Sequence, residues 1–338
     1  MSFFQMLRNN SKEAMIREED KLDSVLFFGQ QYVRSDEVFR LESNMMFQCV
    51  RPLSGVRIIK EKNSSSRYFM RRIENQKSKS WILKIIQNPV KGFLWPSDVV
   101  LIPEWGINGL SWLISYPLDS NDKMTKLSDF LEEQNILDLK KEEIDNLQVK
   151  RMDITKEILH IAKAFFIDVG LRYCNWRADH IYINKSGKMY VNFTDHIDFY
   201  KEKYPFDSRF HDWALYYSPW ENNYSFDGDY FSLFILLFYV LVGRFPYDGR
   251  LMGELSFDTE AEQEYWNNEY RKRAIFIFDP DHDDNSIGTF AHERKHVDAW
   301  KNLSEDVRKL FILVFKKNNP MDADLAFNSL CKILINEE

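Results

Sequence analysis

Glycine is scarce in this chain. There are 12 glycines among 338 residues, or about 3.6%, where soluble proteins average about 7%. A function that depends on a glycine-rich loop around a phosphate therefore needs support from other residues. Aromatic side chains are abundant instead, with 27 Phe, 16 Tyr and 9 Trp, and 44% of all residues are hydrophobic. This composition predicts a packed core and excludes a disordered chain.

Cysteine is also scarce, and long apolar runs are missing. Cys49, Cys174 and Cys331 lie far apart and form no CxxC pair, which favours a reducing compartment over a disulfide framework. The longest apolar run, Phe231–Val242, is too short to cross a bilayer. The first residues become charged before any apolar core forms, so we expect no signal peptide. These features predict a soluble cytoplasmic protein that does not associate with a membrane.

Excess positive charge is absent as well. The chain has 45 basic and 52 acidic residues, which gives a net charge of −7. A broad nucleic-acid interface needs a basic face, so we expect no nucleic-acid partner.

The first third of the chain predicts a helical extension followed by a small sheet. Residues 1–35 scatter apolar side chains among charges, as in a helix. Residues 36–62 alternate apolar and polar side chains, which is typical of strands. The pattern predicts a helix over 68–86 and two strands over 98–118. We therefore divide the chain into a 1–35 extension, a 36–118 domain and a 119–338 domain.

The rest of the chain predicts mostly helices. A short helix is expected at 125–133, and a longer one is expected to end at Gly170, a suitable C′ residue. A hairpin is expected over 180–193, and the run Phe231–Val242 is typical of a helix buried on all sides. Ser304 is positioned to cap a further helix. The sequence thus predicts an α+β fold.

Several segments resemble protein kinases. LRYCNWRADHIYINKSGKMYVNFTD resembles the catalytic loop, hairpin and metal-binding turn, YYSPWE resembles the APE segment, and FDGDYFSLFILLFYVLVGRFP resembles the buried central helix of the large lobe. Two further segments, FLWPSDVV and IFIFDPDHDDNSIG with AWKNLSEDVRKLFILVF, are similar to bacterial kinase-like proteins of tellurite-resistance and stress gene clusters. The resemblance covers residues 36–335. It implies a bilobal fold, with a small antiparallel-sheet lobe containing one helix and a larger helical lobe, and it implies protein partners in a bacterial stress setting.

The resemblance also implies the positions of the nucleotide-binding parts. The three loop glycines of the family fall at Ser43, Met45 and Gln48, so the loop is expected to be an ordinary hairpin. The strand lysine is expected at Lys60, in VRIIK, with Glu74 as its helix partner. Lys84, in WILKII, is a rival placement that leaves too little room for the helix.

The catalytic loop departs from the family pattern at two positions. The base aspartate falls at Asn175, which carries no charge, and the loop asparagine falls at His180. The metal-binding aspartate is retained at Asp195, although the Phe-Gly that should follow it is His196-Ile197. Asp229 fits the aspartate that hydrogen-bonds the catalytic-loop backbone from the central helix, which is an architectural role.

These departures predict a pseudokinase, a scaffold that binds a protein partner and at most weakly binds ATP with Mg²⁺ or Mn²⁺. The alternative is a divergent, active Ser/Thr protein kinase that uses Lys60, Glu74 and Asp195. No cofactor is required by the first hypothesis.

Other motifs compete with this interpretation. HERKH at 292–296 matches the H-E-x-x-H pattern of zinc peptidases, although a third ligand is missing and the kinase resemblance makes it a surface loop. DPDHDDN at 279–285 fails the EF-hand pattern and predicts an aspartate-capped turn. A transition-metal site at His180, Asp195 and His196 is a further hypothesis. If exposed together, four tryptophans would mark a partner site: Trp95, Trp105, Trp112 and Trp266.

Overall fold

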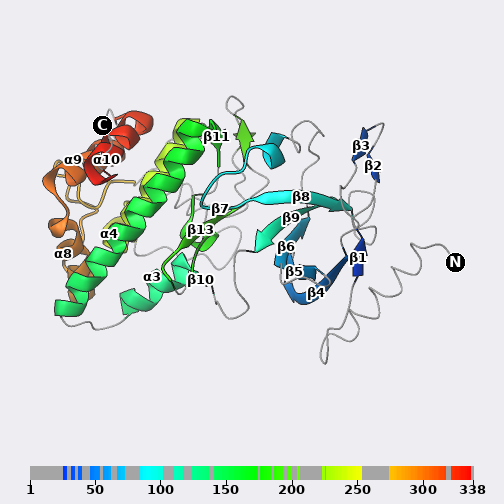
Figure 1. Cartoon of the computed structure of the whole chain (residues 1–338). Coiled ribbons are helices and arrows are strands. Elements are labelled where there is room, and N and C mark those ends of the chain that lie inside the picture. The colour runs from blue at the N-terminus through cyan, green and yellow to red at the C-terminus, as the bar shows by residue number, and fades with distance from the viewer. Residues whose placement is uncertain are drawn as a thin grey trace. The chain divides into compact units, whose positions relative to one another are not determined.

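A computed structural model gives the fold of two compact units (Figure 1). The first unit comprises residues 1–124 and 184–195, and the second comprises 125–183 and 196–338. The structure describes residues 26–28, 32–34, 37–39, 46–53, 56–61, 67–72, 84–101, 110–116, 124–136, 141–173, 176–184, 186–193, 197–199, 204–205, 223–224, 226–252, 274–316 and 321–335. The chain is a mixed α+β protein, as its sequence predicts.

An antiparallel sheet of six strands dominates the first unit. Its spatial order is β1-β4-β5-β6-β9-β8, formed by β1 (Leu26–Phe28), β4 (Met46–Leu53), β5 (Val56–Glu61), β6 (Arg67–Arg72), β9 (Leu110–Tyr116) and β8 (Pro96–Leu101). Two smaller pairs accompany it, β2 (Tyr32–Arg34) with β3 (Glu37–Phe39) and β7 (Phe93–Leu94) with β13 (Met189–Asn192). The two strands predicted over 98–118 are confirmed as β8 and β9.

Two helix predictions in this unit are wrong in part. The sequence predicts a helix over 68–86, but Arg67–Arg72 is strand β6, which pairs with β5 on one side and β9 on the other. The helical turn that the structure describes near the end of this range covers only residues 84–87. Pairing on both edges supplies the backbone hydrogen bonds of this segment, so tertiary contacts override its helical spacing. Leu26–Phe28 and Tyr32–Arg34, inside the predicted helical extension, are also strands.

An aromatic cluster forms the core of the first unit. Trp95 and Trp112 each pack edge-on against Phe193, and the indole N–H of Trp95 donates to the Ile85 carbonyl at 2.8 Å. Trp95 and Trp112 are buried, so they cannot belong to the exposed aromatic patch that the sequence suggested. Trp105 and Trp266 lie outside the described residues.

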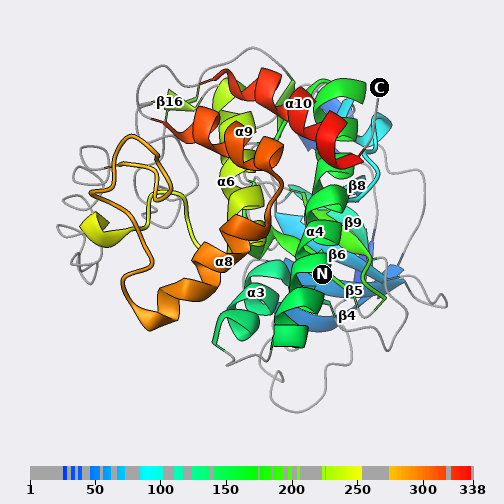
Figure 2. The same ribbon diagram turned by 90° about the vertical axis from the view of Figure 1, so that its left-hand side faces the viewer.

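The second unit is mostly helical (Figure 2). Helix α6 (Phe226–Val242) is apolar on nearly every face and contacts the helices around it. These are α4 (Lys141–Lys163), α8 (Arg294–Asn302), α9 (Glu305–Phe315) and α10 (Ala323–Ile335), while α3 (Leu127–Ile136) precedes α4. The predicted buried helix is thus confirmed as α6. Gly243, with φ of 79°, ends it because glycine adopts this left-handed conformation without strain.

Short elements connect these helices. The predicted cap of α9 is confirmed, since the Ser304 side chain accepts a hydrogen bond from the Val307 N–H. A π-helical turn, η2 (Ala164–Asp168), extends α4 before Gly170, whose φ is 68°. The short strands pair as β10 (Thr125–Lys126) with β12 (Ile181–Ile183), β11 (Leu171–Arg172) with β14 (Asp198–Phe199), and β15 (Tyr204–Pro205) with β16 (Asn223–Tyr224). No helix within the described ranges is long and apolar enough to cross a membrane.

Candidate functional site

A hydrogen bond to helix α6 holds the start of the loop that follows β11. The backbone N–H of Tyr173 donates a 2.6 Å hydrogen bond to Oδ2 of Asp229, which lies in the first turn of α6 and is fully buried. A carboxylate in such surroundings is stable only when hydrogen bonds compensate for its lost hydration. The contact predicted between Asp229 and the loop backbone is therefore present, and it fixes where the loop begins.

Aromatic packing fixes the same loop three residues later. Trp176 is fully buried and packs against Phe165 and Phe166 of η2 and against Tyr173. Cys174 and Asn175, which lie between Tyr173 and Trp176 in the sequence, are outside the described residues. The chain on either side of them is thus anchored, once by a hydrogen bond and once by aromatic contacts.

A cluster of charges follows Trp176. Nε and Nη2 of Arg177 donate to the two carboxylate oxygens of Asp179 at 2.9 and 3.0 Å. His180 ends the short helix η3 (Ala178–His180), and its Nε2 lies 3.8 Å from Oδ2 of Asp179. Burial alone would raise the pKa of Asp179, but the charges of His180 and Arg177 and the hydrogen bonds from Arg177 outweigh it and lower that pKa. Asp179 is therefore ionised at neutral pH.

Only some of the other predicted site residues lie in the part of the chain that the structure describes. His180 belongs to the anchored loop, whereas Glu74, Asn175, Asp195 and His196 lie outside the described residues. The metal site predicted at His180, Asp195 and His196 stays a prediction for this reason.

Lys60 lies on a strand, as predicted. It is in β5, the middle one of the successive strands β4, β5 and β6, and its backbone is opposite Gln48 on one side and Arg67 on the other. The strand that follows, β6, reads RYFMRR and contains no lysine. Lys84 lies in the helical turn over 84–87 and not on a strand, which removes the rival placement.

One of the three positions expected for loop glycines is described. Gln48 lies within β4 and pairs with Leu26 as well as Lys60. A residue inside a paired strand does not belong to an open phosphate loop, which agrees with the predicted hairpin. Ser43 and Met45 lie outside the described residues.

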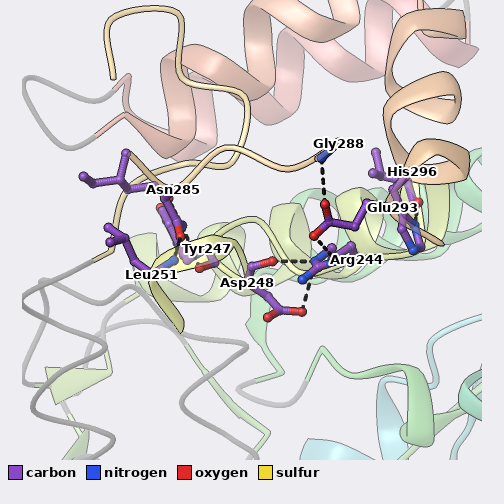
Figure 3. Close-up of polar contacts among 10 residues, drawn as sticks. Arg244, Tyr247, Asp248, Leu251, Asn285, Gly288, Glu293 and His296 are labelled. Atoms are coloured by element: carbon purple, nitrogen blue, oxygen red, sulfur yellow. Dashed lines mark hydrogen bonds and ion pairs between the residues drawn. The ribbon is translucent and has the colours of Figure 1, made fainter. Parts of the chain in front are cut away.

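The HERKH segment is partly buried and not a surface loop, which corrects the expectation. It spans η5 (Ala291–Glu293) and the start of α8, and Glu293 is only 5% exposed. The Glu293 carboxylate accepts hydrogen bonds from the N–H groups of Gly288 and Phe290 at 2.9 and 3.2 Å and pairs with Arg244 at 3.5 Å (Figure 3). Burial opposes ionisation of Glu293, but these hydrogen bonds and the positive charge of Arg244 lower its pKa.

The two histidines of this segment have different surroundings. His296 is buried, and its Nδ1 lies 2.8 Å from the carbonyl oxygen of Val242, at the end of α6. Because a carbonyl only accepts, Nδ1 carries the proton. Burial is the main cause that lowers the pKa of His296, to about 4. His292 is exposed and stacks on Phe290, so the pair does not form a zinc-binding face.

No metal centre is evident in the part of the chain that the structure describes, where no three His, Cys, Asp or Glu side chains are close enough to hold an ion. The acidic segment 279–285 forms a turn in which the Asp279 carboxylate accepts the N–H of Asp281 at 2.9 Å. This bears out the aspartate-capped turn.

Sequence reasoning missed Asn285, the last residue of that segment. Asn285 is fully buried. Its Nδ2 donates to the carbonyls of Tyr247 and Ile275 at 3.0 and 2.6 Å, and its Oδ1 accepts the N–H of Leu251 at 2.9 Å (Figure 3). The available signal was a lone amide at the end of an aspartate run, which does not distinguish a surface residue from a buried one.

Neither a comparison with protein-family models nor one with curated proteins finds a match for this chain.

Proposed function

We propose that this protein is a pseudokinase, a kinase-like scaffold that binds a protein partner, binds nucleotide weakly and does not transfer phosphate efficiently. The hydrogen bond from the Tyr173 N–H to Asp229 is the observation that carries the proposal. A buried carboxylate on the central apolar helix that holds the backbone just before Asn175 is the arrangement that the kinase resemblance predicts. The bacterial stress setting is part of the same proposal and rests on the resemblance alone.

The architecture of each unit supports this proposal. The first unit is built on an antiparallel sheet, and the second is built of helices around α6. A small sheet lobe and a large helical lobe are what the kinase resemblance implies.

The residues at the reaction positions support impaired catalysis. Asn175 cannot accept the proton that a general base removes, and a positioned base contributes about 10²–10⁴-fold in rate. His180 offers an imidazole nitrogen where Mg²⁺ prefers oxygen ligands, so the described residues fit that ion poorly.

A two-part experiment tests the proposal. The purified protein is incubated with γ-labelled ATP and Mg²⁺ or Mn²⁺, alone and with general protein substrates, and the label on protein is counted. The melting temperature is then measured with ATP, with and without each metal. We expect no incorporation above background and only a small shift in melting temperature, because a weakly bound nucleotide stays far below the hundredfold excess over its Kd at which a ligand adds about 2.7 kcal/mol.

The second candidate function is a divergent Ser/Thr protein kinase. Lys60 on a paired strand and the retained Asp195 in the sequence favour it. Its signature is protein-bound label that Lys60→Ala abolishes while Lys84→Ala, a matched change on the exposed helical turn, does not. That pattern would overturn the pseudokinase proposal.

The zinc-peptidase alternative has no support from the HERKH geometry. The Glu293 carboxylate is taken up by two backbone N–H groups and Arg244. Of the two histidines, His296 is buried whereas His292 is exposed and stacks on Phe290. A peptidase needs the glutamate as a base beside a metal-bound water and both histidines on one ion.

A further inference from the structure

The loop after β11 contains an ion pair between residues only two positions apart. The guanidinium of Arg177 and the carboxylate of Asp179 join through two nearly parallel hydrogen bonds of 2.9 and 3.0 Å. The Arg177 side chain is 11% exposed and that of Asp179 is 33% exposed. The carboxylate of Asp179 is thus the more accessible partner, and the guanidinium of Arg177 that it pairs with is mostly buried.

The local backbone holds this geometry. Arg177 is extended, with φ of −138° and ψ of 148°, and immediately precedes η3. The N–H of His180 donates to the Arg177 carbonyl at 3.1 Å, which closes the turn that brings the two side chains together. The ion pair therefore forms within one turn of chain.

The same guanidinium geometry suits a phosphate. The planar fork of an arginine matches the two oxygens of a carboxylate and of a phosphate group equally well. A terminal phosphate carries about −1.5 to −2 charges at neutral pH, against one for a carboxylate. Nε2 of His180 lies 3.8 Å from Oδ2 of Asp179, the oxygen that Nη2 of Arg177 also contacts, so a second nitrogen is close to the position that an anion would take.

From this geometry we infer that Asp179 is an internal competitor for phosphate. Its carboxylate occupies the guanidinium of Arg177, so the loop binds a phosphate-bearing ligand weakly as long as the pair is closed. The inference rests on the proposed function, since it explains why a kinase-like loop would bind nucleotide weakly, and it names the residue that keeps the affinity low.

Calorimetric titration with tripolyphosphate tests the competition directly. Asp179→Asn removes the negative charge but keeps the size of the side chain, and we expect it to tighten tripolyphosphate binding about tenfold over the unsubstituted protein. In the double variant Arg177→Gln with Asp179→Asn the gain should disappear, because the guanidinium is gone. Asp153→Asn, on an exposed position of α4, removes the same charge elsewhere and should leave binding unchanged.

Two results would overturn the inference. One is unchanged affinity in Asp179→Asn, and the other is a gain that survives in the double variant or also occurs in Asp153→Asn. If Asp179→Asn does not fold, Asp179→Ser gives the same comparison with a smaller neutral side chain.

The test also separates the two proposals. Tripolyphosphate has no nucleoside, so a negative result rejects the role of Asp179 and leaves the scaffold proposal standing. Phosphate transfer by the unsubstituted protein rejects the scaffold proposal without bearing on this competition.

Discussion

Tyr173 and Asp229 are 56 positions apart in the chain, and a 2.6 Å hydrogen bond joins the backbone N–H of the first to Oδ2 of the second. Both residues are fully buried. The bond connects the start of the candidate loop to α6, the most apolar of the helices that the structure describes. Its contribution to stability can be measured separately from any activity.

Replacement of Asp229 by Ala should destabilise the second unit by about 2–3 kcal/mol, because the Tyr173 N–H loses a charged acceptor in a buried site. Asp229→Asn keeps an oxygen at this position and should cost clearly less. Urea unfolding followed by circular dichroism measures both. Equal losses for Ala and Asn would contradict an acceptor role, and Asp153→Ala, on an exposed face, serves as the control.

His296 should make the protein less stable as the solution is acidified. Its folded-state pKa is about 4, below the unfolded value of about 6.5. Between these values the unfolded chain binds a proton that the folded chain does not, so stability falls as the pH drops from 6.5 towards 4. The full loss from this residue is about 3 kcal/mol by the same relation.

Unfolding free energies measured at intervals from pH 7 to pH 4 test this. His296→Asn keeps a side-chain N–H for the Val242 carbonyl and cannot titrate, so its pH dependence should be flatter than that of the unsubstituted protein. His282→Asn, at an exposed position, should leave the slope as it was. An unchanged slope in His296→Asn would show that other groups cause the acid sensitivity.

Asn285→Ala should be among the most destabilising single substitutions in this unit, at about 3 kcal/mol. It removes the side-chain hydrogen bonds to three backbone groups, those of Tyr247, Leu251 and Ile275. The Tyr247 carbonyl keeps the N–H of Gly249, whereas the other two groups lose their bond to Asn285, and a buried group left unpaired costs about 1–3 kcal/mol. Asn285→Asp should be no better at neutral pH, since a carboxylate would face two carbonyl oxygens. Chemical denaturation compares both with Asn302→Ala, which removes an exposed amide contact to Gln148. A loss no larger than that of Asn302→Ala would contradict the stabilising role of the Asn285 hydrogen bonds.

Glu293→Ala should destabilise the protein by about 2 kcal/mol and should not abolish any proteolytic activity. The substitution leaves the N–H groups of Gly288 and Phe290 without the carboxylate that accepts from them and removes one of the two carboxylates that pair with Arg244, which keeps Asp248. Glu157→Ala, on an exposed position of α4, should have no measurable effect. Elemental analysis of the purified protein should find no zinc bound one-to-one, and zinc whose content falls in His292→Ala would contradict this assignment.

Long apolar segments and helix caps were predictable from the sequence alone. Helix α6 is apolar on nearly every face, and Ser304 directly precedes two acidic residues. The residues of each segment themselves therefore favour the buried helix and the helix cap. Strand β6 was not predictable as such because Phe69 and Ile73 have helical spacing, while the pairing with β5 and β9 is visible only once the sheet exists.

The candidate site divides in the same way. The kinase resemblance implies that Asp229, at the start of the apolar helix, hydrogen-bonds the backbone of the loop, and the hydrogen bond from Tyr173 is present. The Arg177–Asp179 pair was missed because charged residues two positions apart are common on surfaces. Nothing in the amino-acid sequence shows that the guanidinium of Arg177 is mostly buried. Asn285 was missed for the same reason: burial of a polar residue depends on partners far away in the chain.

Asn285 also has a consequence for how this protein can change over evolutionary time. Together with Arg250, which donates to the carbonyls of Asp283 and Asp284, it joins the chain just before position 253 to the chain just after position 273. A substitution at Asn285 loses bonds to both of these chain segments at once. Position 285 should therefore accept fewer replacements among lineages of the protein than the exposed positions 281–284 that precede it.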